Sequence, residues 1–307
     1  MRRHQPDQAI SPDARDAAIA LGNFDGVHLG HQAVIASARA RAKARGLAFG
    51  IAVFEPHPRR FFEPDAPPFR LQSSAQRART LEMLGVNELF DISFDAALTQ
   101  LSDRAFAETI LTQRLGAAHI GVGYDFRFGR GRMGDVISLA RIGEALGFSV
   151  EAVAPVEIEG AKISSTIIRE AIAAGNVERA AALLSRPWAV EGVVQHGFAR
   201  GRTFGFPTAN LELGDYVRPR LGIYAVRVRI GGARLAGVAS VGVNPTIGAL
   251  VEPVLEAHIF NFDAELYGKR IEVEFAAFLR DEAKFDSVDE LKRRMNEDAA
   301  KARAALA

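Results

Sequence analysis

The chain has 307 residues, of which 48% are hydrophobic and 24% charged, a composition typical of a globular protein with about two domains. Its 38 Lys and Arg side chains nearly balance 37 Asp and Glu side chains, and the resulting net charge of +1 disfavours non-specific binding to nucleic acid or to an acidic membrane. The chain contains no cysteine, which excludes disulfides, thiolate metal sites and a cysteine nucleophile and fits a cytoplasmic protein.

Residues 1–16 are expected to form a frayed leader. Their basic start is followed by polar and acidic residues, where a signal peptide needs an apolar run. The longest stretch without a charged side chain, residues 235–251, contains three glycines and suits loops and strands. We therefore expect no transmembrane segment.

The first half of the chain alternates short apolar runs with longer helical patterns. The runs cover residues 18–24, 48–54, 88–94, 118–124 and 148–154, and the helical patterns cover 31–45, 73–84, 103–115 and 135–146. Strands that are buried on both faces and separated by helices predict an α/β fold with a parallel sheet and right-handed crossovers. Ligands of such sheets bind beyond the carboxyl ends of the strands.

After about residue 186 the pattern changes to a period of two. Ile271, Val273 and Phe275, for example, alternate with charged residues, which predicts a small antiparallel sheet or barrel. A closing helix is predicted after Ser287, which opens a capping box with Glu290. The change of pattern predicts two domains, residues 1–186 and 187–307.

The motif GNFDGVHLGH, residues 22–31, lies where a strand is expected to turn into a helix. Its glycines permit close backbone approach, and the helix N-terminus offers N–H groups to an anion. His28 and His31 are three residues apart, so the motif predicts an anion site with two imidazoles. Two alternatives stay open: a tight turn with two surface histidines, and a zinc site with His57 as third ligand.

Two further segments in the first half suit phosphate binding. In GYDFRFGRGRMGD, residues 123–135, arginines interleave with glycines as in a cationic lid, and Phe126 and Phe128 would stack or anchor it. In ISSTIIREAI, residues 163–172, Ser165 or Thr166 would cap a helix, with an arginine one turn later facing the anion. The alternatives are an ordinary solvated loop and a plain cap.

The second half carries GRTFGFPTANL, residues 201–211, and a glutamate on a predicted strand. Thr208 and Asn210 are two residues apart on an extended segment, which places both side-chain oxygens on one side as hard ligands for Mg²⁺. Glu256 would be a buried general base. The alternatives are an ordinary proline turn and a solvent-facing strand residue.

Together and in this order, these motifs resemble the bifunctional riboflavin kinase/FAD synthetase family of bacteria, over about residues 18–302. The first module resembles a Rossmann-like nucleotidylyltransferase, matched by GNFDGVHLGH, DFRFG and ISSTIIR. The second resembles a six-stranded flavokinase barrel, matched by GRTFGFPTAN, NPTIG (residues 244–248) and LEAHIFNFDAELYG. The resemblance implies ATP-dependent phosphorylation of riboflavin to FMN, followed by adenylyl transfer from ATP to FMN. FMN and FAD are then substrate and product rather than redox cofactors, and Mg²⁺ accompanies ATP.

The resemblance also implies residue roles. The catalytic set is His28, His31, Arg169 and Glu256. ATP and phosphates would be bound by Gly22, Asn23, Phe24, Gly26, Asp125, Arg127, Ser165, Thr166, Gly201 and Gly205. Thr208 and Asn210 would hold the metal.

The sequence departs from the family pattern at Ser185, where glycine is usual, at Asn261, where aspartate is usual, and in SSAQRARTLEML, which lacks an acidic–Lys pair. None of these positions is expected to touch a phosphate or metal contact.

Two other hypotheses remain for the function. One is a single-activity enzyme in which the other module is a regulatory flavin-binding domain. The other is a non-catalytic protein that binds nucleic acid or a partner, which the near-neutral charge disfavours. We expect no nucleic-acid or membrane partner and a weak homo-oligomer at most.

Overall fold

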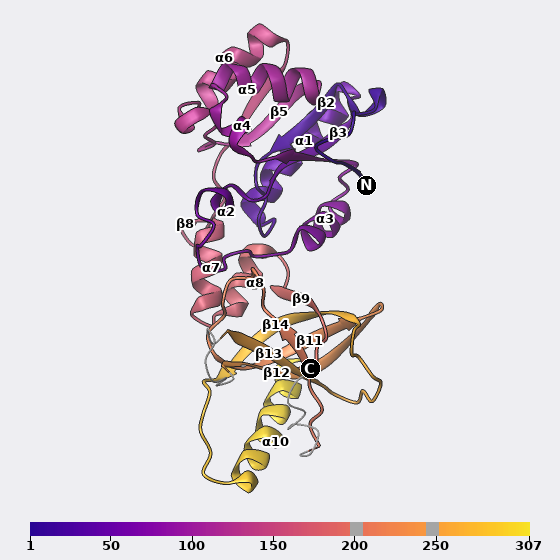
Figure 1. Cartoon of the computed structure of the whole chain (residues 1–307), viewed down its shortest axis with the longest axis vertical. Helices are drawn as coiled ribbons and strands as arrows, with labels where there is room; N and C mark the ends of the chain where they lie inside the picture. Colours follow the sequence, from indigo (N-terminus) through magenta and orange to yellow (C-terminus); the bar gives the residue numbers. More distant parts are fainter. Residues whose placement is uncertain (197–204, 244–251) are drawn as a thin grey trace. The chain divides into compact units, whose positions relative to one another are not determined.

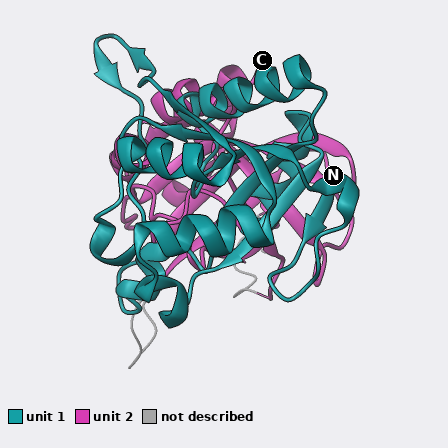
Figure 2. Ribbon diagram, turned by 90° about the horizontal axis from the view of Figure 1, so that it is seen from above, with its two compact units in different colours: residues 1–67, 74–164 teal, residues 68–73, 165–307 magenta. Residues whose placement is uncertain are grey.

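The computed structural model describes residues 1–196, 205–243 and 252–307. The chain forms two compact units, which are described separately (Figures 1 and 2). The first unit comprises residues 1–67 and 74–164, and the second comprises residues 68–73 and 165–307. None of the helices in the described ranges is long and apolar enough to cross a membrane.

The first unit is built on a parallel sheet. Its strands are β1 (Arg2–His4), β2 (Ala17–Leu21), β3 (Phe49–Glu55), β4 (Glu88–Ser93), β5 (Ala117–Gly123) and β6 (Ser149–Val153). They are ordered β1-β4-β3-β2-β5-β6, and every neighbouring pair is parallel. Five of the six coincide within a few residues with the predicted apolar runs, so the predicted parallel sheet is confirmed.

The helices of the first unit lie between these strands in the chain. They are α1 (Leu29–Arg45), α2 (Pro58–Phe62), α3 (Ser74–Met83), α4 (Ala96–Gln100), α5 (Asp103–Phe106), which continues as a π-helical segment (Ala107–Arg114), and α6 (Val136–Leu146). A short hairpin of β7 (Glu157–Ile158) and β8 (Ala161–Lys162) follows β6. Side chains of β2 alternate between two hydrophobic clusters, because Ile19 and Leu21 pack with α6 residues while Ala18 and Ala20 pack with α1 residues. Both faces of the sheet are therefore covered, as a parallel sheet requires.

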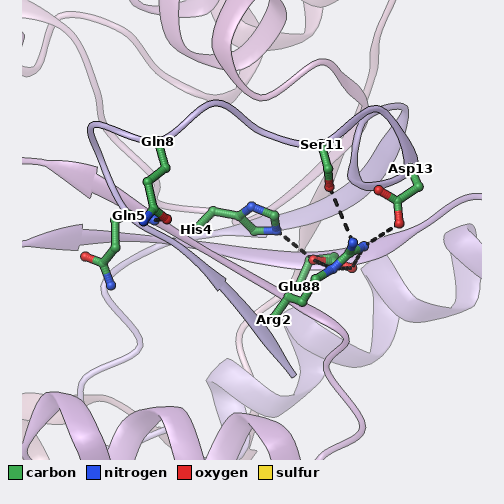
Figure 3. Close-up of polar contacts among 7 residues, drawn as sticks. All are labelled: Arg2, His4, Gln5, Gln8, Ser11, Asp13 and Glu88. Atoms are coloured by element: carbon green, nitrogen blue, oxygen red, sulfur yellow. Dashed lines mark hydrogen bonds and ion pairs between the residues drawn. The ribbon is translucent and has the colours of Figure 1, made fainter.

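The prediction of a frayed N-terminus is wrong, because Arg2–His4 forms strand β1 beside β4. Figure 3 shows the polar contacts that hold it, centred on the buried carboxylate of Glu88. His4 Nε2 lies 2.7 Å from one oxygen of Glu88, and Arg2 Nη2 lies 2.6 Å from the other. Arg2 also pairs with Asp13 at 2.8 Å. The partner carboxylate is more than 80 residues away in sequence, so no local pattern indicates this strand.

The second unit contains an antiparallel sheet of six strands. They are β9 (Ala189–Val193), β10 (Ala209–Glu212), β11 (Gly222–Ile230), β12 (Ala233–Val243), β13 (Pro253–Ile259) and β14 (Arg270–Arg280), ordered β10-β13-β12-β11-β14-β9. The two edge strands meet where Gln195 N donates to Asn210 O at 2.9 Å, which nearly closes the sheet into a barrel. The predicted antiparallel barrel is therefore confirmed. Glu274 is one of the charged residues that alternate with Ile271, Val273 and Phe275, a pattern that predicts a solvent-facing side chain. It is instead buried between Arg229 and Arg234.

In the described part of the second unit, the barrel is accompanied by the helices α7 (Ser165–Ala173), α8 (Val177–Leu184) and α10 (Val288–Ala305). The predicted cap of the last helix is present, because Ser287 Oγ accepts a hydrogen bond from Glu290 N at 3.1 Å. Helix α7 begins at Ser165, so Ser165 and Thr166 lie in its first turn rather than at the cap position.

Residues 68–73 belong to the barrel unit although they lie early in the chain. Val217 N donates to Arg70 O at 2.9 Å, and the buried indole of Trp188 donates to Leu71 O at 2.9 Å. Arg186, whose pKa burial lowers to about 10, donates to Gln72 Oε1 at 2.7 Å. The compact barrel unit thus extends over residues 165–186 and recruits this segment, whereas the functional division at residue 186 stays a prediction.

Candidate active site

The order of the strands places two of the predicted motifs at one edge of the first sheet. Strand β2 is central, with β3 on one side and β5 on the other, so the chain changes its winding direction between β2 and β5. The GNFDGVHLGH motif follows β2, and the DFRFG loop follows β5. Both therefore lie at the carboxyl ends of the strands, next to the switch point where open α/β sheets bind ligands.

The turn between β2 and α1 has an unusual backbone. Phe24 and Val27 adopt positive φ angles of 50° and 43°, although both carry bulky side chains, and both are at most 1% exposed. Gly26 also has a positive φ of 89°. Such conformations cost about 1–3 kcal/mol each and persist only where neighbouring groups impose them, which is common at functional sites.

The two histidines of the motif are stacked on each other. His28 caps α1: its Nδ1 accepts a hydrogen bond from His31 N at 3.2 Å, and the two ring centroids are 3.6 Å apart. His28 is 6% exposed, so the interpretation as a surface histidine is wrong for this residue. Because Nδ1 accepts a backbone N–H, the neutral ring carries its proton on Nε2. The cap therefore leaves Nε2 as a donor at the positive end of the helix.

The end of the first unit approaches the same helix terminus. A Cβ atom built on Gly30 would lie 3.2 Å from the His28 ring and 3.6 Å from the carbonyl oxygen of Ile163. Ile163 begins the ISSTIIR segment, so its backbone lies beside the amino end of α1. Ser165, Thr166 and Arg169 follow in α7 of the second unit, where Arg169 Nε donates to Phe69 O at 2.7 Å.

The DFRFG loop is fastened to its unit by its phenylalanines. Phe126 and Phe128 stack at 5.7 Å and pack on the hydrophobic cluster, and Phe128 pairs with Gly134 through two backbone hydrogen bonds. The two rings therefore anchor the loop, which is one of the two roles predicted for them. Arg127, which is half exposed, lies 3.6 Å from Asp135.

Sequence reasoning missed Lys162 of β8. Its Nζ lies 2.6 Å from Asp125 Oδ2 and donates to Tyr124 OH at 2.9 Å. These hydrogen bonds, first to Asp125 and then to Tyr124, raise the pKa of Lys162, so it stays a cation at neutral pH. The sequence signal that could have indicated Lys162 is its position directly before the ISSTIIR segment.

The kinase-type residues meet across three strands of the second unit. Asn210 on β10 is the register partner of Glu256 on β13, and Glu256 is also the partner of Ser240 on β12. Residues directly opposite each other in an antiparallel pair share one face of the sheet. The structure therefore brings the predicted metal ligand and the predicted base together. Glu256 lies on a strand as predicted, but it is half-buried rather than buried.

Two cavities of the second unit border these residues. One, of about 280 Å³, is lined by Thr208 and Asn210 together with Asp263 and Tyr267. The other, of about 210 Å³, is lined by Thr208, Glu256 and the aromatic side chains Phe206, His258 and Phe285. Thr208 borders both cavities, so the two cavities adjoin at this residue.

The aromatic-lined cavity is also bordered by an ion pair between the partly buried Arg280 and the buried Asp298. Arg280 binds both carboxylate oxygens of Asp298, with distances from 2.6 to 3.1 Å, and so ties α10 to β14. Burial raises the pKa of Glu282, which lines the same cavity, although nearby Arg280 acts in the opposite direction.

Several predictions have a different outcome or lie outside the described residues. Gly201 and the NPTIG segment fall in the two undescribed stretches, whereas Gly205 is exposed with a φ of 82°. His57, considered as a zinc ligand, caps α2 by accepting a hydrogen bond from Arg59 N at 3.1 Å. Within the described ranges, no group of three or more His, Cys, Asp or Glu side chains is arranged to hold a metal ion.

Comparison with known proteins identifies two families along the chain. Residues 10–167 match the FAD synthetase model, and residues 184–306 match the riboflavin kinase model. A bifunctional riboflavin kinase/FMN adenylyltransferase from Pseudomonas fluorescens is 41% identical over 97% of this chain and 96% of its own length. One from Haemophilus influenzae is 38% identical over 94% of this chain and 93% of its own length.

A solved structure shares the architecture of the whole chain. It is described as a macrolide-efflux protein from Streptococcus pneumoniae, is 35% identical, covers 98% of both chains and has a TM-score of 0.89. Fold and site thus define a two-unit transferase with a nucleotidylyltransferase sheet and a flavokinase barrel. The chain belongs to the bifunctional riboflavin kinase/FMN adenylyltransferase family. Riboflavin kinase and FMN adenylyltransferase are accordingly its two activities.

Proposed function

We propose that each unit performs one of the two reactions with the residues described above. The observation that carries this proposal is that the residues of the two chemistries gather separately: the stacked histidines lie at the switch point of the parallel sheet, and the Asn210–Glu256 pair lies in the barrel. In this proposal residues 1–186 and 187–307 supply the chemical groups of the two domains.

In the adenylyltransferase reaction, a phosphate oxygen of FMN attacks the α-phosphorus of ATP. The bond from that phosphorus to the β-phosphate oxygen breaks, and pyrophosphate leaves. His28 and His31 would hold the phosphates and stabilise the charge that develops on the transferring group, together with the N–H groups at the start of α1. Pyrophosphate binding by Ser165, Thr166 and Arg169 stays a prediction from the family resemblance.

In the kinase reaction, the terminal ribityl hydroxyl of riboflavin attacks the γ-phosphorus of ATP, and ADP leaves. Glu256 would accept the proton of that hydroxyl, because it borders the aromatic-lined cavity and shares its sheet face with Asn210. Asp263 and Tyr267 line the neighbouring cavity, which we assign to the nucleotide. Phosphoryl transfer needs mainly positioning and neutralisation of charge, which this set of groups provides.

The side chains of Thr208 and Asn210 fit a magnesium ion. Their hydroxyl and amide oxygens are hard donors that line one cavity, and Mg²⁺ is usually bound by few protein oxygens together with substrate phosphates. When bound, the ion would neutralise phosphate charge on the nucleotide. We further propose a cytoplasmic enzyme that acts on riboflavin, FMN and ATP, forms at most a weak homo-oligomer, and has no nucleic-acid or membrane partner.

A time course with riboflavin and MgATP tests the proposal, with the flavins separated by chromatography. We expect FMN to accumulate first and FAD to follow, and FMN supplied directly to yield FAD without a kinase step. If riboflavin is converted to FMN but no FAD forms, or if FMN is converted to FAD but riboflavin is not phosphorylated, the single-activity hypothesis is supported instead.

A further inference from the structure

A buried arginine touches the strained turn that precedes His28. Arg77 lies on α3 and is 1% exposed. Its Nη1 donates to the carbonyl oxygen of Asn23 at 3.1 Å, and its Nη2 donates to Glu55 Oε2 at 2.5 Å. Glu55 ends strand β3, the neighbour of β2 in the sheet. The guanidinium therefore ties the turn to the carboxyl edge of the sheet, within the first unit. The SSAQRARTLEML segment was expected to touch no phosphate contact. Arg77 departs from this expectation, because it donates to the backbone of Asn23, one of the predicted phosphate-binding residues.

The carbonyl that accepts from Arg77 lies directly before the strained part of the turn. It belongs to the peptide unit between Asn23 and Phe24, and Phe24 is the first residue of the turn with a positive φ. Fixing the direction of this carbonyl fixes the plane of the peptide. Because the peptide is trans, the N–H of Phe24 points in the opposite direction, away from Arg77. One hydrogen bond thus sets the orientation of a backbone donor in the motif.

Stability alone is a poor explanation for this arrangement. Removing a guanidinium from water costs several kcal/mol, and a buried ion pair is often no more stabilising than apolar side chains of the same volume. The strained backbone at Phe24 and Val27 also costs free energy, and such strain needs neighbouring groups that impose it. A charged fork that meets a carboxylate and a carbonyl in fixed directions supplies that constraint.

We propose that Arg77 is a positioning residue for adenylyl transfer: paired with Glu55, it holds the Asn23–Phe24 peptide so that the turn presents its donors and the following histidines in register with the nucleotide phosphates. The proposal rests on the assignment of adenylyl transfer to this turn. It makes Arg77 act through the backbone of the motif, without contact to the reacting atoms.

The test uses the full-length chain with Arg77→Met and Arg77→Lys. Methionine removes the charge and both hydrogen bonds, whereas lysine keeps the charge beside Glu55 but cannot reproduce the planar fork. Because a small misplacement in an active site costs about 100-fold, we expect both variants to lower kcat for FAD synthesis by roughly 10- to 100-fold. KM for FMN should change by less than about threefold, since uniform substrate binding is not removed. Riboflavin phosphorylation in the second unit should stay within about twofold.

A matched control comes from Arg15→Lys. Arg15 also donates to backbone carbonyls of the first unit, at 3.1 Å to Arg114 O and 3.0 Å to Gln113 O, but it precedes β2 and so lies toward the amino edge of the sheet. We expect this variant to leave kcat for FAD synthesis unchanged. An equal fall in kcat for this control would overturn the proposal, because it would show that any loosening of the unit has the same effect.

The outcomes also distinguish a failure of the Arg77 proposal from a failure of the assignment of adenylyl transfer to this turn. If the unmodified enzyme makes no FAD, the assigned function fails. If it makes FAD and a folded Arg77→Met variant keeps the original kcat, only the role of Arg77 is refuted. Should the methionine variant fail to fold, the lysine variant decides: original kcat refutes the proposal, and a reduced kcat with an unchanged unfolding temperature supports it.

Discussion

Replacing His28 by asparagine separates the two tasks that the structure gives this residue. The ring caps α1 through Nδ1, which accepts from His31 N, and it leaves Nε2 as a donor. Asparagine is among the best N-cap residues, and its amide oxygen can accept the same backbone N–H. The substitution should therefore preserve the helix while removing the imidazole donor and the stack with His31, whose ring centroid lies 3.6 Å away.

The two expected effects differ in size. Loss of one preorganised donor to developing charge costs about 100- to 1000-fold in rate, so FAD synthesis by His28→Asn should fall by that factor. Its free energy of unfolding should stay within about 1 kcal/mol of the original, because the cap is kept. His28→Ala should show the same loss of rate with a further loss of stability of about 0.5–2 kcal/mol.

The assay measures FAD formation from FMN and MgATP, with riboflavin phosphorylation as the internal control in the same chain. His57→Asn is a matched substitution, since His57 also caps a helix through Nδ1 in the first unit, and it should leave both reactions unchanged. Unchanged FAD synthesis by folded His28→Asn would refute the donor role. Equal loss of both reactions would refute the separation of the two sites.

Three further predictions concern other residues. Glu256→Gln should slow riboflavin phosphorylation by about 100- to 10,000-fold and leave FAD formation from supplied FMN near normal, as measured by flavin chromatography; normal phosphorylation would reject the base role. Asp298→Asn leaves the partly buried guanidinium of Arg280, whose side chain is 15% exposed, without its carboxylate, so denaturant unfolding should show a loss of about 1–3 kcal/mol. Burial, with nearby Arg41 adding to it, lowers the pKa of His119 below the ordinary 6.5. The unfolded chain therefore binds more protons than the folded one as the pH falls below 6.5, and stability should decrease there. His119→Gln should flatten this part of a urea-midpoint profile, whereas an unchanged slope would contradict the assignment.

The elements that could be predicted from sequence are those whose signal is local. Strands β2 to β5 are buried on both faces, so they stand out as short, mostly apolar runs between helical patterns, whereas β6 is a partly exposed edge strand. Strand β1 carries Arg2, Arg3 and His4, and it is held by carboxylates on β4 that are distant in sequence. A charged strand of three residues has no apolar pattern, and only the folded sheet shows why it pairs.

The site residues also divide into those with a local sequence signal and those without one. The histidine motif, the Thr208–Asn210 spacing and Glu256 were predictable because each lies in a short segment with a recognisable pattern. Lys162 and Arg77 were not, because each acts on a motif from another element. The remaining departures from the family pattern have a backbone explanation.

Ser185 and Asn261 both adopt positive φ angles, of 58° and 56°. Glycine reaches this region without steric cost, which explains why the family's usual glycine suits position 185. Asparagine and aspartate tolerate it better than most residues, so Asn261 keeps the conformation that the family's aspartate would adopt. Neither departure alters a group to which we assign chemistry.

The packing units and the family boundaries do not coincide, and the reason lies in residues 68–73. This segment falls within the FAD synthetase match, yet its backbone accepts hydrogen bonds from Val217 and from the indole of Trp188, which is 1% exposed. Cutting the chain at residue 186 would remove the carbonyl of Leu71 that the buried indole requires, and an unsatisfied buried donor costs about 1–3 kcal/mol. It would also remove α7 and α8, which belong to the same compact unit. The barrel that carries the residues proposed for the kinase is therefore completed by a segment that lies within the FAD synthetase match.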